Sequence, residues 1–124
     1  MDDKSKIKHI LCAVRSRPGG EETVERAIER ALATNAKLTF CQIVSAGFVN
    51  RLSNRGSARK AASQELADMA EFALSLVQDQ AELRGVADVD TIVRMGSVRE
   101  IMIQLVAETQ ADLVILGRPR KSPR

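Results

Sequence analysis

Basic side chains and glycines in two separate segments of this sequence could together bind an anion. The first segment, RSRPGG, carries Arg15 and Arg17 and ends at Gly20. The second, GRPRKSPR, begins at Gly117, and its basic residues are Arg118, Arg120, Lys121 and Arg124. Guanidinium groups bind phosphates and carboxylates through charge-assisted hydrogen bonds, so this pattern indicates a phosphate or nucleotide site. Exposed loop arginines are, however, commonly only solvated, and on charge alone that plainer interpretation is favoured.

Residues that commonly catalyse reactions are not grouped in the sequence. His9 is the single histidine, with no cysteine or carboxylate cluster beside it, so we expect an ordinary strand residue. Cys12 and Cys41 lie inside apolar runs and match no metal motif, and we expect both to be buried and free. No glycine-rich segment carries the lysine of a phosphate loop. The sequence therefore predicts neither an enzyme nor a metal site.

Apolar runs alternate with amphipathic segments along the sequence. The runs at 7–14, 38–44, 87–95 and 113–116 are typical of buried strands. Apolar residues spaced three and four apart predict three helices between them. Their predicted buried faces are Val24, Ala27, Ile28, Ala31 and Leu32; Leu66, Met69, Ala70, Ala73, Leu74 and Val77; and Val98, Ile101, Met102, Leu105 and Val106. The polar stretch 45–60 is predicted to be a long loop.

Short signals mark where these elements end. Asn35 and Gly85 are predicted to close the first two helices in a left-handed conformation. Gly96 is predicted to end the third strand. Ser97, with Glu100 three residues later, has the pattern of a capping box at the start of the third helix.

The order of elements predicts one α/β domain over residues 1–124, with a parallel sheet and helices on both faces. In such sheets, ligands bind beyond the carboxyl ends of the strands, where the strand order reverses. If the order is 3-2-1-4, the reversal lies between the first and fourth strands. The two basic segments would then meet there, beside the amino end of the first helix, which favours anions.

Composition excludes several classes of protein. With 44% hydrophobic residues and a net charge of +3, the chain is typical of a soluble globular protein. No apolar run is long enough to cross a membrane, and the first residues do not form a secretory signal, so the expected compartment is the cytoplasm. Only three aromatic residues are present, all phenylalanine, which makes nucleic-acid binding an unfavoured alternative.

Several segments of this sequence resemble universal stress protein domains. KHILCAVRSRPGGEE is similar to that family's first strand and turn, and NAKLTF is similar to the start of its second strand. VRMGSVREIMIQLVAETQADLVILGR is similar to its third strand, third helix and fourth strand. The resemblance implies a Rossmann-like fold of the adenine nucleotide alpha hydrolase type, with strand order 3-2-1-4-5, usually as a homodimer. One branch of the family binds ATP and the other does not.

The resemblance also identifies positions where this sequence departs from the ATP-binding branch. Arg15 stands where that branch has an aspartate, and Ser16 and Arg17 replace the glycine and serine that follow it. Ile43 matches an aliphatic residue beside the adenosine. The first glycine of the phosphate-wrapping segment is kept as Gly117, but Arg120 replaces the second. The candidate ligand-binding residues are Val14, Arg15, Ser16, Arg17, Ile43, Gly117, Arg118 and Arg120.

Two functions remain open at this point. The favoured one is a universal-stress-like regulatory or interaction domain with a degenerate nucleotide site and no bound cofactor. The alternative is a variant module that holds a nucleotide or another small anion, ATP included, through its arginines.

The end of the sequence bears on self-association. The fifth strand of the family is missing or lies beyond Arg124. Two alternatives remain open: Arg124 is the natural terminus, or the sequence is part of a longer domain. If the fourth strand is an open sheet edge, its unpaired backbone groups favour a homodimer formed edge to edge.

Overall fold

The computed structural model describes residues 6–15, 20–45, 47 and 56–117, with side chains from residue 60 onward in the last range. These residues form four strands and three long helices. Their bounds, in chain order, are β1 (His9–Ala13), α1 (Gly20–Thr34), β2 (Lys37–Ser45), α3 (Gly56–Arg84), β3 (Val89–Gly96), α4 (Val98–Thr109) and β4 (Leu113–Ile115). The predicted alternation of strands and helices is confirmed.

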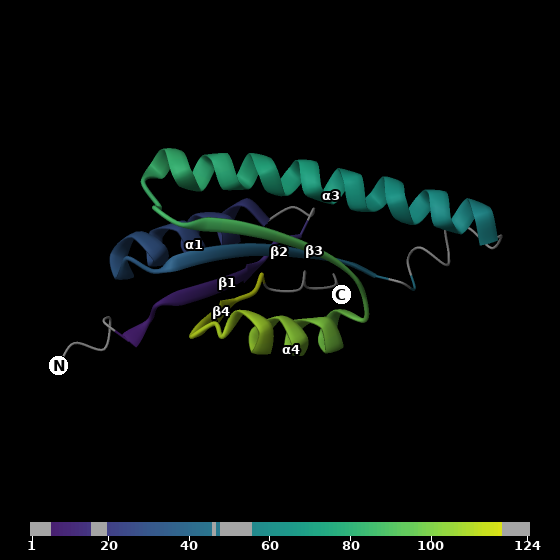
Figure 1. Cartoon of the computed structure of the whole chain (residues 1–124). Coiled ribbons are helices and arrows are strands. Elements are labelled where there is room, and N and C mark those ends of the chain that lie inside the picture. The colour runs from purple at the N-terminus through teal and green to yellow at the C-terminus, as the bar shows by residue number, and fades with distance from the viewer. Residues whose placement is uncertain (1–5, 16–19, 46, 48–55, 118–124) are drawn as a thin grey trace, which may run out of the picture.

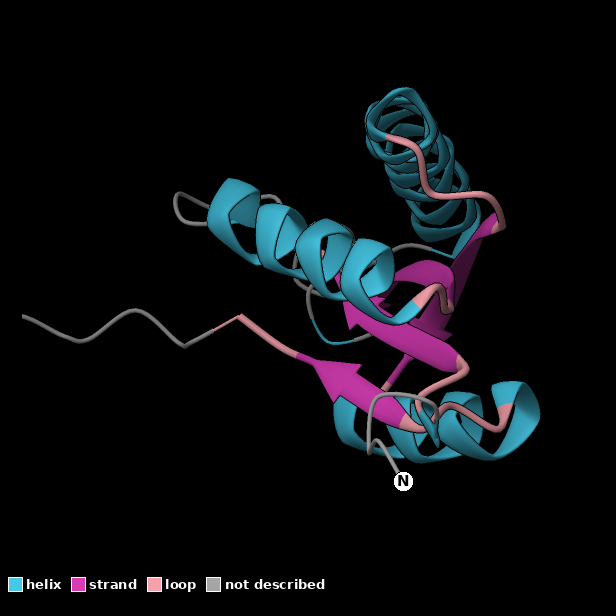
Figure 2. Cartoon of the chain, turned by 90° about the vertical axis from the view of Figure 1, so that its left-hand side faces the viewer, coloured by secondary structure: helices cyan, strands magenta, loops and turns pink. Residues whose placement is uncertain are grey.

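The four strands form one sheet in the order β3-β2-β1-β4, and each pairing is parallel. Figure 1 and Figure 2 show α1 and α3 on one face of this sheet and α4 on the other. This arrangement follows from right-handed crossovers, because the two connections that run toward β3 and the one that returns to β4 must lie on opposite faces. The predicted α/β fold and strand order are confirmed.

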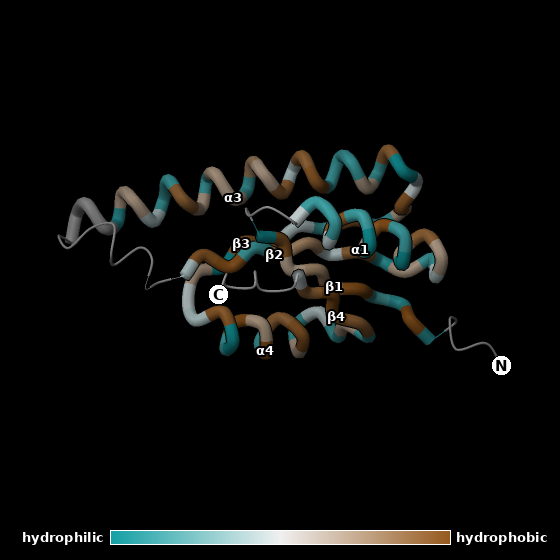
Figure 3. The backbone as a smooth tube through the Cα atoms, turned by 180° about the vertical axis from the view of Figure 1, so that it is seen from behind, coloured by the Kyte–Doolittle hydropathy of each residue, from teal (hydrophilic) through white to brown (hydrophobic). Residues whose placement is uncertain are grey.

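The core lies on both sides of the sheet and is centred on β1. Ile10, Leu11 and Cys12 have no solvent exposure. Ile10 and Cys12 pack beneath α1 and α3, whereas Leu11 packs with Leu105 against α4, because successive side chains of a strand alternate between faces. Figure 3 shows β1 and β4 as mostly hydrophobic and the helices as mixed in character. A nearly continuous apolar run is what a strand covered on both faces requires.

The predicted end signals at Asn35, Gly85, Gly96 and Ser97 agree with the structure, with one difference in detail. Asn35, at φ 60°, and Gly85, at φ 109°, both follow helices in left-handed conformations, as predicted. Gly96 ends β3 at φ 150°. Ser97 occupies the N-cap position of α4, but its side chain forms no capping hydrogen bond. The sequence therefore predicted the N-cap residue correctly, but the hydrogen bond of a capping box is not formed.

The long loop predicted over 45–60 is wrong at both ends. Ser45 still belongs to β2, and α3 begins at Gly56. Alanines at positions 58, 61 and 62 have the highest intrinsic helix propensity, and this outweighs the polar character of the segment. None of the described helices combines the length and apolar character that crossing a bilayer needs.

The buried face of α3 also differs from its predicted stripe. Ala70, Leu74 and Ala81 are buried against the sheet, but Met69 is 65% exposed. Three-and-four spacing fits more than one face of a helix that carries apolar residues on two sides, so spacing alone assigned Met69 to the wrong side.

Candidate functional site

The carboxyl ends of β1 and β4 lie side by side, at the point where the strand order reverses. Ile10 pairs with Leu113 and Cys12 pairs with Ile115. Continued by two residues, this register places Val14 level with Gly117. On the other side, the Val14 N–H donates to the Cys41 carbonyl at 2.8 Å, which extends the pairing of β1 with β2. The structure thus brings together the starts of the two basic segments.

Two glycines set how closely the backbone approaches α1 here. A Cβ atom at Gly20 would lie 2.5 Å from the Arg15 carbonyl oxygen, which is closer than real side chains come. A Cβ atom at Gly117 would lie 3.0 Å from Oγ1 of Thr23, in the first turns of α1. Glycine is needed at Gly20 because its neighbour is backbone and cannot turn aside. The amino end of α1 is therefore held between the ends of β1 and β4.

The candidate residues differ in exposure. Arg15 is exposed, whereas Val14, Ile43 and Gly117 are half-buried. The arginine thus faces solvent beside an apolar strand end. The other candidates, Ser16, Arg17, Arg118 and Arg120, lie outside the described residues.

The charges at this end of the sheet are mixed. The free N–H groups at the start of α1 and the helix dipole favour an anion near Gly20. The Arg15 guanidinium adds a positive charge, and within the described residues it forms no ion pair. Glu21 and Glu22, both exposed in the first turn, oppose an anion. The described part of the site therefore suits a small anion held by few contacts.

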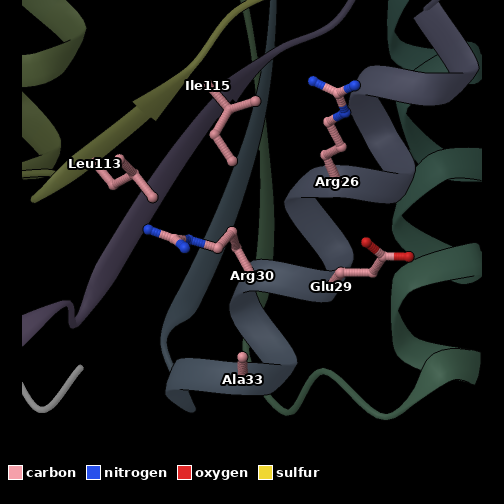
Figure 4. A pocket seen from close by; sticks show the side chains of 6 residues that line it. All are labelled: Arg26, Glu29, Arg30, Ala33, Leu113 and Ile115. Atoms are coloured by element: carbon pink, nitrogen blue, oxygen red, sulfur yellow. The ribbon is translucent and has the colours of Figure 1, made fainter.

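A groove of about 550 Å³ lies along the open side of the sheet, between α1 and β4. Its lining residues are Arg26, Glu29, Arg30, Ala33, Leu113 and Ile115. In Figure 4 the Arg30 side chain extends toward Leu113, and Glu29 points away from it. None of the four described candidate residues, Val14, Arg15, Ile43 and Gly117, lines this groove.

His9 has a structural role at the amino end of the sheet. Its Nδ1 lies 2.9 Å from the Thr109 carbonyl oxygen, and its Nε2 lies 2.7 Å from Oγ1 of Thr39. Because a carbonyl only accepts, Nδ1 must carry the proton and donate it. Asp112 accepts hydrogen bonds from the backbone N–H groups of Lys8 and His9, and these lower the pKa of its carboxyl group. The prediction that His9 is a strand residue is confirmed.

Both thiols are buried and free, as predicted. Burial raises the pKa of Cys12 to about 12, with the neighbouring Cys41 adding to the effect, and raises that of Cys41 to about 11. Both are therefore protonated near neutral pH and lack the thiolate that a nucleophile or metal ligand requires. No group of three or more histidine, cysteine or acidic side chains that could hold a metal ion occurs among residues 6–15, 20–45, 47 and 56–117.

The sequence matches the universal stress protein family over residues 6–124. The chain belongs to this family. Nothing among curated protein sequences is significantly similar to it.

Solved structures of the universal stress family share the fold. The protein UspA from Lactobacillus plantarum is 19% identical, with a TM-score of 0.75 over 95% of this chain and 82% of that one. A family member from Burkholderia pseudomallei is 18% identical, with a TM-score of 0.78 over 95% and 85%. A universal stress protein in complex with cAMP is 21% identical, with a TM-score of 0.57 over 87% and 70%. At these identities the likeness shows the fold alone.

Sequence reasoning missed Thr23 as part of the candidate site. Thr23 is 8% exposed, and its hydroxyl group lies against the backbone of Gly117. One signal could have identified it, since Thr23 stands four residues before Ala27 and therefore shares the buried face of its helix. A threonine in the first turns of the first helix, on that face, must point at the neighbouring strand end.

Proposed function

We propose that this chain is a regulatory or interaction domain that does not hold ATP as the ATP-binding branch of its family does. The observation that carries the proposal is Arg15, exposed at the carboxyl end of β1, where the resemblance places an aspartate. A guanidinium group has only donors, so it cannot accept a hydrogen bond from a ribose hydroxyl or an adenine amino group. Gly20 lies close to the Arg15 carbonyl, which places Arg15 beside the amino end of α1.

A second function, binding of an anion with a single phosphate, has support from the same residue. Arg15 and the amino end of α1 offer one positive charge and a few N–H donors, enough for one phosphate group. One solved relative is a universal stress protein in complex with cAMP, which carries a single phosphate. For this chain, cAMP is therefore the first nucleotide to compare with ATP.

Titration of the full chain with ATP and with cAMP separates the two functions. Under the first, neither nucleotide saturates the protein at millimolar concentration, and native mass spectrometry finds none bound after purification. Under the second, cAMP binds, ATP does not, and Arg15→Ala weakens cAMP by about tenfold, as loss of one charged contact predicts. A low-micromolar affinity for ATP that does not depend on salt contradicts both.

The proposal includes no catalytic step. The thiols of Cys12 and Cys41 are protonated, and His9 is hydrogen-bonded at the amino end of the sheet, away from the candidate site. We expect no release of phosphate when the full chain is incubated with ATP and Mg²⁺. Phosphate release that copurifies with the chain and is lost in Arg15→Ala would overturn this part.

Self-association through β4 is the proposed mode of assembly. Within the described sheet β4 pairs only with β1, so its outer side presents unpaired backbone groups. Leu113 and Ile115 line the neighbouring groove, and Leu116 is 60% exposed just beyond the strand. Two copies that pair along β4 would cover both the unpaired backbone groups and these apolar side chains.

Sedimentation of the full chain tests this assembly. We expect a dimer that Leu116→Lys weakens and that Ile103→Lys leaves unchanged, because Ile103 is similarly exposed (65% against 60%) but lies on α4. A monomer for the unmodified chain at high concentration contradicts edge pairing and leaves the proposals on nucleotide binding untouched.

A further inference from the structure

The long helix α3 is apolar on two opposite sides. One side, with Leu74 and Ala81 at no exposure, packs on the sheet. The other side carries the α3 stripe, which we define as Met69, Phe72, Leu76 and Leu83. At 100° per residue these four side chains fall within about 60° of one another and opposite Leu74. The stripe therefore faces away from the sheet on which α3 packs. Figure 1 shows α3 as the outermost helix on its face of the sheet.

The side chains of the α3 stripe are strongly exposed. Their exposed fractions are 65% for Met69, 66% for Phe72, 55% for Leu76 and 89% for Leu83. Single exposed apolar residues are ordinary, but a row on one helix face usually marks an interaction surface. Phe72 is one of only three aromatic residues in the sequence, and aromatic side chains dominate the binding energy of protein interfaces.

The spacing of the α3 stripe is that of a helix–helix seam. Met69, Leu76 and Leu83 are seven residues apart, and Phe72 follows Met69 by three. Apolar residues in this register are the a and d positions through which two helices pack side by side. Phe72 is the first d position, and the second, three residues after Leu76, is the acidic residue Asp79. The stripe runs for about 21 Å along the helix, from Met69 to Leu83, and contains three apolar a positions and one apolar d position.

The charges beside the α3 stripe are acidic. Asp68 and Glu82 lie along one flank, Asp79 stands at the second d position beside them, and all three are exposed. Asp68 accepts a hydrogen bond from Gln64, and none of the three forms an ion pair with another described residue. Glu65 continues the acidic character toward the start of the helix. A second copy of α3 would bring like charges together across the seam, which is unfavourable.

The other flank of the α3 stripe is already used within the domain. Arg84 donates to Glu25 of α1 at 2.7 Å, and Gln80 donates to the same carboxylate at 3.1 Å. This pairing neutralises the nearest basic residue and fixes α3 to α1. The surface around the α3 stripe is therefore apolar, and its negative charges on one side have no basic residue to compensate them among the described residues.

We propose that the α3 stripe binds an amphipathic helix of a partner protein that carries lysine or arginine beside its apolar positions. Apolar contact across the seam supplies the affinity, and the acidic flank selects a basic helix over an acidic one. This surface lies on the side of the sheet formed by β2 and β3, away from β4, so its occupation does not depend on assembly through β4 (Figure 1).

Two synthetic helical peptides test the proposal on the full chain. Both peptides are three heptads long with leucine at the a and d positions; one has lysine and the other glutamate at the flanking e and g positions. We expect the lysine peptide to bind at least about tenfold more tightly than the glutamate peptide, with an affinity that falls as salt is added. Fluorescence anisotropy of labelled peptides measures both affinities.

Variants locate the binding surface. Phe72→Glu combined with Leu76→Glu should reduce affinity for the lysine peptide by at least about tenfold. Ile103→Glu is the matched control, because Ile103 is 65% exposed but lies on α4. Asp79→Lys combined with Glu82→Lys should reverse the preference and favour the glutamate peptide. All five positions are exposed, and circular dichroism should show each variant folded.

Three outcomes would overturn the proposal. The first is no binding of the lysine peptide, or equal binding of both peptides. The second is equal loss of binding in the stripe variant and in Ile103→Glu. The third is a dimer of the chain alone that the stripe variant abolishes, because the stripe would then bind a second copy.

Discussion

The two ends of the sheet are held in opposite ways. At the amino end, side chains make the contacts: His9 connects β1 to β2 and to the end of α4, and Asp112 caps two backbone N–H groups. At the carboxyl end, the backbone itself makes the close contacts, through Gly20 and Gly117. Side-chain hydrogen bonds stabilise the first end, and the absence of side chains shapes the second.

Removing the His9 side chain should have the largest effect on stability. His9→Ala breaks two hydrogen bonds and leaves Oγ1 of Thr39, a residue only 1% exposed, without its partner. We expect the free energy of unfolding to fall by about 2–3 kcal/mol. Urea denaturation measures the change.

A double-mutant cycle serves as the control for His9. Thr39→Val removes the hydroxyl group that the ring contacts, so the double variant should lose less than the sum of the single losses. Additive losses, or a loss for His9→Ala of less than about 0.5 kcal/mol, would mean that this bridge does not stabilise the amino end.

Adding one carbon atom at Gly20, at the carboxyl end of the sheet, should have the next largest effect on stability. In Gly20→Ala the new Cβ atom meets the Arg15 carbonyl oxygen, and the backbone must shift. We expect a loss of about 1–3 kcal/mol in the free energy of unfolding. Gly47→Ala is the control, since its Cβ atom would lie at an ordinary 3.6 Å from the nearest side chain, and we expect less than about 0.5 kcal/mol. Equal losses in the two variants would show that the close approach of Gly20 to the Arg15 carbonyl does not cause the loss of stability.

Asp112 should make the stability of the amino end depend on pH. The two backbone N–H donors lower the pKa of its carboxyl group below the ordinary value of 3.8. A lowered pKa in the folded state stabilises the protein above the ordinary value, and this contribution disappears as pH falls through the folded-state value. The Tm of Asp112→Asn should therefore lie below that of the unmodified chain at pH 6, and the difference should shrink below about pH 4. A difference that stays constant down to pH 2 contradicts this explanation.

Removing a side chain at the carboxyl end should have the smallest effect on stability. Arg15 is exposed and forms no ion pair with the described residues, so Arg15→Ala should change the free energy of unfolding by less than about 0.5 kcal/mol. Arg99→Ala, an exposed arginine on α4, is the matched control for stability. A loss above 1 kcal/mol for Arg15 alone would remove the contrast between the two ends of the sheet.

The strands were predictable from the sequence because their burial requires continuous apolar runs. Ile10 to Cys12 is such a run, and periodicity identified the centres of the buried faces of α1 and α4 through Ile28 and Leu105. At the ends of these faces it was wrong, because Leu32 is 39% and Val98 is 46% exposed. The order of the strands followed from the family resemblance together with the chirality of parallel crossovers. Left-handed positions at Asn35 and Gly85 were predictable because few residues adopt them.

What the sequence could not show depends on contacts between distant segments. The bridge from His9 to Thr39 and Thr109 exists only after three elements have come together. The side of α3 that faces outward was ambiguous, because a helix with two apolar faces has no single stripe. The close approach of Gly20 to Arg15 depends on the angle at which α1 leaves the sheet, and a glycine in a loop does not reveal that angle.

The pairing of β1 with β4 has a consequence for the order in which this domain can form. Ile10 pairs with Leu113, so the central strand gains its second neighbour only after the intervening helices and strands have been synthesised. Contacts between residues so far apart in sequence are slow to form and leave apolar surface exposed in the meantime. During synthesis, β1, β2 and β3 can assemble with α1 and α3 on one face, while the side chain of Leu11 on the other face waits for α4. The nascent domain therefore exposes this apolar face until α4 packs on it.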